Sequence, residues 1–239
     1  MIETLDDFIT EFSKIKAMGW IKTHRSGPTG IGKTLEDLLG IPENNLDEPD
    51  FGEYELKSCR KNSQSMLTMF TRTPQPPKSN SYLREKYGYS SDAYDNDEKV
   101  LHATLTAERF VSIANTGNKL KISCDETKIF IESGDGPENV YWDRIGLKEA
   151  FEKKYKNKFV YVKAKSRGSG ANEEFWFDEA YEVSGFDYDS FTNLLEAGKI
   201  FIDLRIGQYP DGRTHDHGTG FRIRESDQPV LFKTNRRIA

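Results

Sequence analysis

The chain has 239 residues, a formal net charge of −5 and 36% hydrophobic residues, enough to bury a substantial core in one large domain or two closely joined lobes. No apolar run approaches membrane-spanning length and the N-terminus lacks a basic-then-apolar signal pattern, so we expect a soluble intracellular protein. Cys59 and Cys124 are too few for a disulfide framework. The acidic total does not exclude a nucleic-acid partner, because the distribution of charge over the surface decides which partner is attracted.

The N-terminal part predicts a helix followed by a cationic loop. Apolar residues recur at helical spacing and predict an amphipathic helix from about Thr4 to Met18. The polar, glycine-rich loop at 22–30 contains Lys22 and Arg25 beside hydroxyl groups, so it is suited to contacts with phosphate. The alternative interpretation is an ordinary solvated loop.

A short helix is predicted over residues 30–40, where it ends at a glycine. Lys33 lies near its start and continues the cationic loop, and Glu36 supplies a carboxylate. The Gly-Ile-Gly-Lys-Thr run at the beginning of this helix lacks the spacing of a phosphate-binding P-loop. We therefore do not expect an NTPase.

The residues from Asp50 to Lys57 indicate a metal-dependent chemistry. Asp50 follows a proline, and apolar and charged residues then alternate, so Glu53, Glu55 and Lys57 are expected on one face of a strand. A carboxylate from the turn and another from the strand can hold a hard divalent cation through oxygen, with the lysine within reach of a metal-bound water. Glu36 is the candidate for a third carboxylate.

Charges are sorted around this stretch. Residues 12–35 and 56–84 contain lysines and arginines but no acids, whereas residues 34–56 contain eight acids and no lysine or arginine. The sequence thus predicts an acidic pocket flanked by cationic arms. A nuclease needs this arrangement, because negative groups bind the metal while positive groups hold the polyanionic backbone.

The remaining elements indicate an α/β core around a mixed sheet, together with a β-rich lobe. The expected elements are a strand at 66–71 beside the strand of Glu55, a short helix at 81–87, a β meander at 100–142, a helix at 145–155, strands at 158–165 and 174–182, a helix at 189–197 and a strand at 199–206.

The segment from Arg205 to the C-terminus is locally cationic, with seven Lys or Arg against four acids. It contains His215-Asp216-His217-Gly218, and the surrounding glycine and threonine predict a loop. Side chains that donate or accept hydrogen bonds beside arginines suit the reading of base edges in the major groove. A metal site on His215 and His217 is the alternative, but the sequence positions no third ligand for it.

These residues resemble a known family. Pro49-Asp50 followed by Glu55-Leu56-Lys57 is similar to the PD-(D/E)XK nuclease motif, and Glu36 is similar to the extra acid of its MutH-like branch. The stretches that resemble the MvaI/BcnI restriction endonucleases, the MvaI side more closely than the BcnI side, are 67–71, 203–207 and 214–223. The resemblance covers nearly the whole chain and is weakest between residues 92 and 139.

The resemblance implies a fold of the α/β (α+β) class, with a PD-(D/E)XK restriction-endonuclease-like core in which helices flank a mixed central sheet. A second, β-rich lobe is expected to form a DNA cleft with it. The implied catalytic lobe spans residues 1–110 and is completed by part of 145–200. The implied DNA-recognition lobe spans residues 111–144 and 200–239.

The resemblance also implies a catalytic site. Asp50 and Glu55, with the Leu56 carbonyl, are expected to coordinate Mg²⁺, for which Mn²⁺ substitutes. Lys57 is expected to orient the attacking water or to stabilise the charge that develops on the phosphate. Glu36 is expected to bind a second ion or to fix the ligands of the first. The implied DNA-binding residues are His215, Asp216, His217, Arg222 and Arg213 in the recognition lobe, and Lys33, Arg25 and Lys22 near the N-terminus.

The function implied is a type II, sequence-specific endonuclease that cuts double-stranded DNA at a short, G/C-rich, near-palindromic site such as CCWGG, where W is A or T. It is expected to act as a monomer that nicks each strand in turn in the prokaryotic cytoplasm. A cognate DNA methyltransferase is expected in the same restriction-modification system, but not as a bound partner. Two alternatives stay open, namely a MutH-like mismatch-repair nicking endonuclease and a non-catalytic DNA-binding module.

Overall fold

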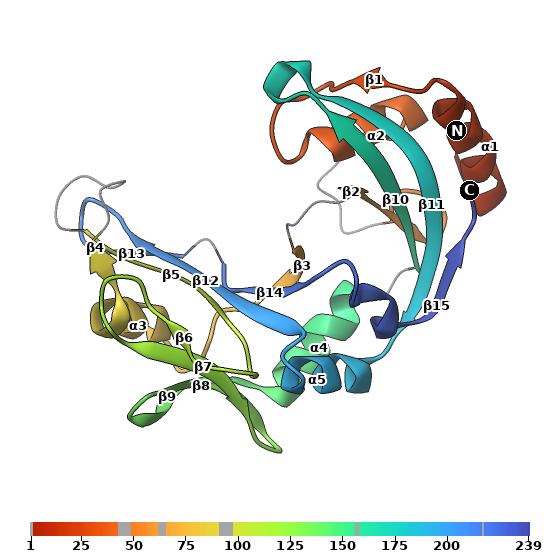
Figure 1. The fold of residues 1–239 in the computed structure, drawn as a ribbon. Helices are drawn as coiled ribbons and strands as arrows, with labels where there is room; N and C mark the ends of the chain where they lie inside the picture. Colours follow the sequence, from red (N-terminus) through yellow and green to blue (C-terminus); the bar gives the residue numbers. More distant parts are fainter. Residues whose placement is uncertain (1, 43–48, 62–65, 91–97, 156–157, 217) are drawn as a thin grey trace. The chain divides into compact units, whose positions relative to one another are not determined.

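The computed structural model describes residues 2–42, 49–61, 66–90, 98–155, 158–216 and 218–239. The chain forms two compact units, and each is described by itself. Unit 1 comprises Met1–Gln64, Tyr155–Phe186 and Phe232–Ala239, and unit 2 comprises Ser65–Lys154 and Asp187–Leu231. Figure 1 shows the elements of both, coloured in chain order.

Unit 1 is built on a mixed sheet with the strand order β1-β11-β10-β2, in which β15 also pairs with β11. β2 is parallel to β10, and the other pairings are antiparallel. β10 and β11 are long and strongly curved (Figure 1). The elements of unit 1 are α1 (Leu5–Ala17), β1 (Ile21–Lys22), α2 (Gly30–Leu39), β2 (Tyr54–Arg60), β10 (Lys158–Arg167), η1 (Gly170–Asn172), β11 (Glu174–Phe186) and β15 (Phe232–Arg237).

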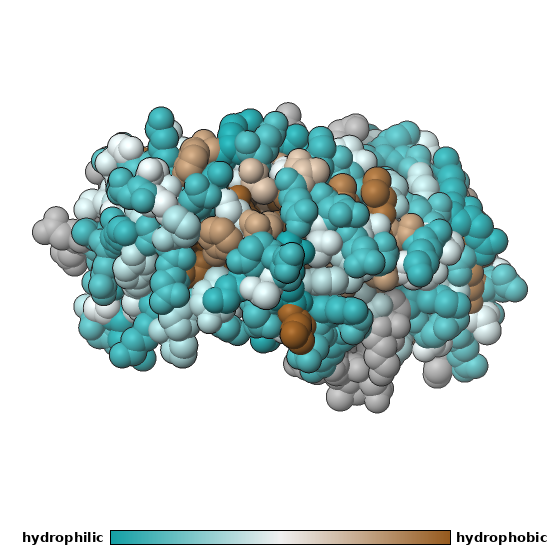
Figure 2. All heavy atoms as spheres, turned by 90° about the horizontal axis from the view of Figure 1, so that it is seen from below, coloured by the Kyte–Doolittle hydropathy of each residue, from teal (hydrophilic) through white to brown (hydrophobic). Residues whose placement is uncertain are grey.

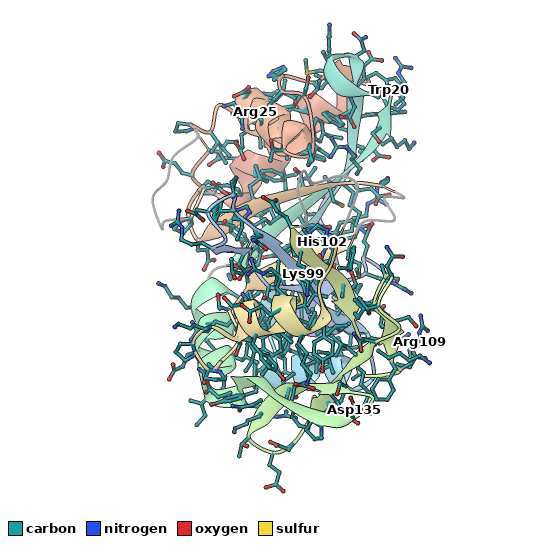
Figure 3. All side chains as sticks on the ribbon, turned by 90° about the vertical axis from the view of Figure 1, so that its left-hand side faces the viewer. Trp20, Arg25, Lys99, His102, Arg109 and Asp135 are labelled. Carbon is teal, nitrogen blue, oxygen red and sulfur yellow. The ribbon has the colours of Figure 1, made fainter. Side chains whose placement is uncertain are left out.

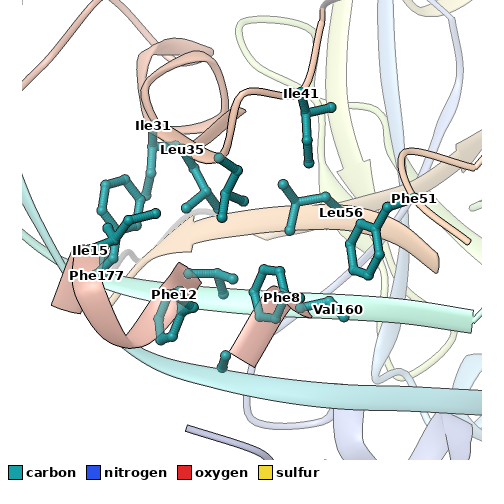
Figure 4. Close-up of a cluster of buried hydrophobic side chains, with 14 of the residues drawn as sticks. Phe8, Phe12, Ile15, Ile31, Leu35, Ile41, Phe51, Leu56, Val160 and Phe177 are labelled. Carbon is teal, nitrogen blue, oxygen red and sulfur yellow. The ribbon is translucent and has the colours of Figure 1, made fainter. Parts of the chain in front are cut away.

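The core of unit 1 lies between this sheet and the helices α1 and α2. Phe8 and Phe12 recur at helical spacing on α1 and are fully buried. They pack in one cluster with Leu35 of α2, Leu56 of β2 and Val160 of β10 (Figure 4). This shared apolar core fixes α2 beside β2, the two elements that carry the predicted carboxylates.

Unit 2 contains two further sheets. In one the strand order is β3-β14-β12-β5-β4, with β13 paired to β12, and in the other it is β6-β7-β8-β9. The elements of unit 2 are β3 (Leu67–Thr71), α3 (Ser79–Tyr87), β4 (Tyr89–Ser90), β5 (Lys99–Leu105), β6 (Val111–Ser112), β7 (Lys119–Cys124), β8 (Lys128–Ser133), β9 (Gly136–Asp143), α4 (Arg144–Lys154), α5 (Tyr188–Glu196), β12 (Ile200–Gln208), β13 (Thr214–Asp216), β14 (Gly220–Ile223) and η2 (Gln228–Leu231).

Aromatic packing joins the β3–β14 sheet to the helices α4 and α5. The Phe70 ring of β3 stacks on Phe221 of β14 with 4.6 Å between the ring centroids. Phe151 of α4 and Phe191 of α5 meet Phe70 at 5.7 and 5.8 Å. These rings are large apolar groups in offset and edge contacts, which stabilise a core beyond the area they bury.

Three expectations from the sequence are wrong in detail. β3 is not a neighbour of β2 but pairs with β14, because Phe70 packs in the aromatic core of unit 2. β2 begins at Tyr54, since Phe51 and Tyr54 exchange backbone hydrogen bonds and close a tight turn. The expected loop at His215 and Asp216 is the strand β13, because these residues pair with the end of β12.

The boundaries of the units also differ from those of the expected lobes. Residues 65–110 lie in unit 2 and not with the predicted metal-binding stretch, because β3 and β5 pair with β14 and β12. Residues 232–239 lie in unit 1, because β15 pairs with β11. The DNA cleft and the division of labour between the units stay predictions.

The surface is largely polar. Hydrophilic side chains cover most of the face seen in Figure 2, and apolar side chains occur there in small, separate patches. Among the residues that the structure describes, no helix is long and apolar enough to cross a membrane.

Helix α3 is tied to β9 by a buried carboxylate. The Glu138 side chain is 6% exposed and accepts hydrogen bonds from the Tyr82 and Tyr87 hydroxyls and from the Lys86 ammonium at 3.0 Å. Burial opposes the ionisation of Glu138, but these three donors outweigh it and lower the pKa of Glu138 to about 2.

We expect Glu138→Gln to lower the free energy of unfolding by about 2 kcal/mol at pH 7. Because the folded-state pKa lies below the ordinary 4.5, the contribution is fully present above pH 4.5 and is lost as the pH falls towards 2. Urea unfolding of both proteins at pH 7 and pH 3 measures this. A difference between wild type and variant that is the same at both pH values would contradict the prediction.

Candidate active site and recognition surface

Asp50 lies beside the edge strand of unit 1. After Asp50, the tight turn between Phe51 and Tyr54 reverses the chain into β2, and Gly52 adopts φ +51° in it. A side chain at Gly52 would lie 2.7 Å from the Glu3 carbonyl oxygen, so the turn requires glycine. The reversal brings the Asp50 carboxylate to the Leu56 N–H, which donates to Asp50 Oδ2 at 2.6 Å.

The hydrogen bond to Asp50 also fixes the direction of the Leu56 carbonyl. β2 is the last strand in the order of its sheet, so in the described part of the chain it pairs with β10 on one side and with no strand on the other. The Leu56 N–H bonds to Asp50 and not to β10, and the N–H and C=O of one strand residue point to the same side. The Leu56 carbonyl therefore points towards the side where the Asp50 carboxylate lies.

Glu55 and Lys57 share one face of β2. They are opposite Phe159 and Tyr161 of β10, while Leu56 between them packs in the helix-covered core. The Lys57 ammonium donates to Glu55 Oε1 at 2.6 Å, and the side chains are 40% and 27% exposed. This face is open enough for the pair to meet a ligand.

Electrostatic interactions couple three of the predicted residues. Burial raises the pKa of Asp50, and the Leu56 N–H opposes this rise. The negative charge of Glu55 raises the pKa of Asp50 further, and the positive charge of Lys57 lowers it. The structure thus brings Asp50, Glu55 and Lys57 close enough to act on one another.

Glu36 approaches β2 from the helix side. A Cβ placed on Gly32 would lie 3.8 Å from Glu36 Oε1 and 3.7 Å from the Ser58 hydroxyl, so both side chains converge near Gly32. Ser58 is on the face of β2 opposite to Glu55 and Lys57, because side chains alternate along a strand. Glu36 and Ser58 therefore flank β2 from the side of α2.

The donor set suits a hard cation. Two carboxylates and one backbone carbonyl are oxygen ligands, and Mg²⁺ is commonly bound by one or two carboxylates with water in its other positions. In the described parts of the chain, no group of three or more His, Cys, Asp or Glu side chains is placed to hold a metal ion, so Glu36 does not join Asp50 and Glu55 in one ligand set. The set Asp50, Glu55 and Leu56 carbonyl fits Mg²⁺, and it does not fit a structural zinc site.

The loop before α2 is held by Arg60 at the end of β2. The Arg60 guanidinium donates to both carboxylate oxygens of Glu173 at 2.6 and 2.8 Å and to the Pro28 and Gly27 carbonyl oxygens at 3.1 and 3.2 Å. At Gly30 a side chain would lie 2.1 Å from the Arg25 carbonyl oxygen. Arg60 and Gly30 therefore set the path of the loop into the helix that carries Glu36.

The predicted cationic contacts differ in their surroundings. Lys22 of β1 and Arg25 of the following loop are exposed. Figure 3 labels Arg25. Lys33 forms an ion pair with Asp37 at 2.9 Å and is 23% exposed on its side chain. Glu53 is outside the site, because it lies in the turn and pairs with Lys158 at 2.5 Å.

Unit 2 presents a polar face on the sheet that contains β12. Residues paired in register have their side chains on the same face, and Asp203 and Arg205 of β12 are opposite Thr104 and His102 of β5. Arg222 of β14 is paired in register with Phe201 of β12, so its side chain lies on the same face. Figure 3 marks His102 on β5. The alternate residues of β12, such as Ile202 and Leu204, are buried beneath this face.

A buried aspartate organises the arginines of this face. The Asp203 side chain is 6% exposed and accepts from the Thr104 hydroxyl at 2.6 Å, from Arg205 Nε at 3.0 Å and from Arg222 Nη1 at 2.8 Å. Sequence reasoning named Arg222 but missed Asp203 and Arg205. The sequence pattern that could have identified them is an acid and an arginine two residues apart on an otherwise apolar strand.

The predicted histidine segment is partly described. His215 of β13 is opposite Gly207, and its ring lies 4.5 Å from the Tyr209 ring. Asp216 accepts hydrogen bonds from Asn80 and from the Gly218 N–H. Arg213 is 76% exposed and pairs with Asp211. His217 lies outside the described residues.

Beside Gly218, an open hollow of about 410 Å³ is lined by Thr71, Arg72, Thr73 and Gln75. These side chains are donors or acceptors of hydrogen bonds, and Thr71 to Thr73 are exposed. The hollow therefore extends the polar surface that follows β13.

The comparisons with known proteins identify the class. The model of the MvaI/BcnI restriction endonuclease family matches residues 9–232, so the chain belongs to this family. It is therefore a type II site-specific deoxyribonuclease, a hydrolase.

Two solved structures are similar over the whole chain. A complex of restriction endonuclease MvaI with its cognate DNA substrate is 31% identical, with a TM-score of 0.80 and 100% of both chains covered. MvaI in the absence of DNA is 30% identical, with a TM-score of 0.64 and coverage of 100% of this chain and 99% of that one. A search of curated protein sequences finds no match.

We expect Arg60→Lys to loosen the loop before α2, because a lysine cannot form the bidentate contact with Glu173 or reach both carbonyls with one planar group. Amide hydrogen exchange of residues 23–30 should become at least about tenfold faster, a change of roughly 1.4 kcal/mol in local opening. Arg167→Lys is the matched control, since Arg167 pairs with Glu174 but is 54% exposed. Equal exchange in wild type and Arg60→Lys would contradict this role.

Proposed function

We propose that the chain hydrolyses phosphodiester bonds of double-stranded DNA at a short, G/C-rich, near-palindromic site, with Mg²⁺ as cofactor, and leaves 5′-phosphate and 3′-hydroxyl ends. The observation that carries the proposal is the convergence of Asp50, Glu55 and Lys57 at the open edge of β2, fixed by the 2.6 Å hydrogen bond from the Leu56 N–H to Asp50. This set matches the PD-(D/E)XK pattern, and the family of the chain supports the reaction class.

Asp50 and Glu55, with the Leu56 carbonyl, would hold the ion, and Mn²⁺ would substitute for Mg²⁺. When bound, the ion neutralises charge on the scissile phosphate and eases deprotonation of a water. Glu36 binds a second ion or orients the ligands of the first. Its approach from the α2 side supports the orienting role.

Lys57 acts on the reacting groups. Its ammonium has three N–H donors, of which one is directed to Glu55 Oε1 at 2.6 Å. The other two can orient the attacking water and donate to a phosphate oxygen as negative charge develops. Glu55 thus holds Lys57 in place as well as providing a metal ligand.

DNA binding divides between backbone and base contacts. Lys22, Arg25 and Lys33 contact phosphates and position the duplex. The polar face of unit 2 reads base edges, with Arg222 suited to guanine, and Arg213 and the His215-Asp216-His217 segment contribute to it. The solved complex of MvaI with cognate DNA supports a duplex as the substrate.

We propose a monomer with one catalytic centre that nicks the two strands in turn. On supercoiled plasmid, an open-circular intermediate should therefore appear before the linear product.

We expect Asp50→Asn and Lys57→Met each to lower the cleavage rate by about a thousandfold or more while leaving DNA affinity nearly unchanged. The amide introduced by Asp50→Asn keeps an acceptor for the Leu56 N–H but lacks the charge that holds the cation. The measurements are plasmid cleavage in Mg²⁺ and duplex binding in Ca²⁺.

The matched controls are Glu53→Gln and Lys158→Met, an acid–lysine pair of the same strand region that lies outside the site. Both controls should cleave at close to the wild-type rate. An Asp50→Asn protein that cuts at the wild-type rate in Mg²⁺ would refute the assignment of the site.

A further inference from the structure

Helix α3 buries polar side chains, although burying apolar side chains there would cost less free energy of desolvation. Asn80 and Arg84 are 7% and 6% exposed, and Ser79 is also buried. Burying an amide or a guanidinium is unfavourable unless it is hydrogen-bonded. Among the described residues Asn80 Oδ1 and Arg84 Nε have no hydrogen-bond partner, whereas the other nitrogens of these two side chains point to specific groups.

The contacts of this helix face converge on the hairpin that ends in β13. Asn80 Nδ2 donates to Asp216 Oδ2 at 2.5 Å, and the Ser81 hydroxyl lies 2.7 Å from the Thr214 hydroxyl. The Arg84 guanidinium nitrogens lie 3.5 Å from the carbonyl oxygens of Gly207 and Gly212, on both sides of the hairpin turn. α3 thus holds the hairpin from one side, while Glu138 ties the other side of the helix to β9.

The register of β13 assigns its side chains to opposite faces. Asp216 and Thr214 pair with Ile206 and Gln208 of β12, whereas His215 pairs with Gly207. Side chains that pair in register share a face, so Asp216 is on the face of Ile206, which is fully buried. His215 is on the opposite face, with Arg205 and Asp203.

The two oxygens of Asp216 are both engaged within the protein. Oδ2 accepts from Asn80, and Oδ1 accepts from the Gly218 N–H at 2.8 Å. A carboxylate that is held through both oxygens anchors its strand, and a strand shifted by one residue would exchange the faces of all its side chains.

We propose that Asn80 is a positioning residue for sequence recognition: its hydrogen bond to Asp216 fixes the register and face of β13, so that His215 contacts the bases and Asp216 does not. This inference rests on the proposed function, since it requires the polar face of unit 2 to read DNA. It changes the expectation that Asp216 is itself a base reader.

The test first determines the preferred sequence of the wild-type protein by sequencing cleaved plasmid. Cleavage rates are then measured on a duplex with this sequence and on duplexes with one base pair changed. Asn80→Ala should lower the ratio of these rates about tenfold or more, because β13 loses its anchor. Glu85→Gln, on the exposed side of α3, should leave the ratio unchanged.

A double variant that exchanges the side chains at positions 80 and 216 distinguishes a structural role of Asp216 from a contact of Asp216 with DNA. In the double variant Asn80→Asp with Asp216→Asn, the amide at position 216 can donate to the new carboxylate and still accept from the Gly218 N–H. The pair is restored but the carboxylate has moved to α3. We expect the exchanged pair to recover discrimination to within about threefold of wild type, while each single variant loses it.

A purely structural role would reduce the active fraction equally on all duplexes and leave the ratio unchanged, so an unchanged ratio in Asn80→Ala overturns the proposal. Failure of the exchanged pair to recover discrimination also overturns it, because a carboxylate at position 216 is then needed by the DNA. Thermal melting shows which variants fold. If Asn80→Ala does not fold, the exchanged pair tests the proposed role of Asn80. A wild-type protein that cuts all duplexes equally would instead refute the proposed function.

Discussion

The hydrogen bond from the Leu56 N–H to the Asp50 carboxylate is the contact on which the proposed catalytic site in unit 1 depends. It exists because β2 is an edge strand among the described residues, so this N–H has no strand partner there, and because the turn at Gly52 returns the chain to it. The same bond aims the Leu56 carbonyl to the side of the carboxylate. Alternation along β2 then places Glu55 and Lys57 on one face and anchors the strand through Leu56 in the core. We propose that this strand edge, which is unpaired among the described residues, is the site for a cation and a phosphate.

In unit 2, the alternation of side chains along a strand also separates a buried face from a polar face. Its central sheet buries Ile202, Leu204 and Ile206 on one side, which leaves the intervening positions of β12 for polar groups. Asp203 Oδ2 accepts from both Arg205 and Arg222, while Oδ1 accepts from Thr104, so the guanidinium groups are oriented before any ligand arrives. Preorganised donors lose less conformational entropy on binding, and this favours discrimination between bases. Helix α3 stabilises the neighbouring hairpin through buried polar contacts, which are directional in a way that apolar packing is not.

Much of the proposed catalytic site could be predicted from the sequence because it is local. Asp50, Glu55 and Lys57 lie within eight residues, and strand alternation and a turn signal suffice to bring them together. The recognition face could not be predicted in the same way, since it depends on the pairing of β12 with β5, β13 and β14, which lie far apart in the chain. The wrong partner for β3 and the shifted unit boundaries have the same cause. A segment such as 214–216 has a weak strand pattern of its own, and its pairing partner decides its conformation.

The proposed function requires that a cation held at the edge of β2 drives cleavage of DNA at a sequence chosen by unit 2. Its most direct test is to incubate the purified chain alone with unmodified plasmid in Mg²⁺ and to sequence the ends of the products. The proposed function predicts discrete cuts at one short, G/C-rich sequence, abolished by EDTA and restored by excess Mg²⁺. Absence of cleavage on plasmids that contain every short G/C-rich sequence, or cleavage that persists in EDTA, would contradict it.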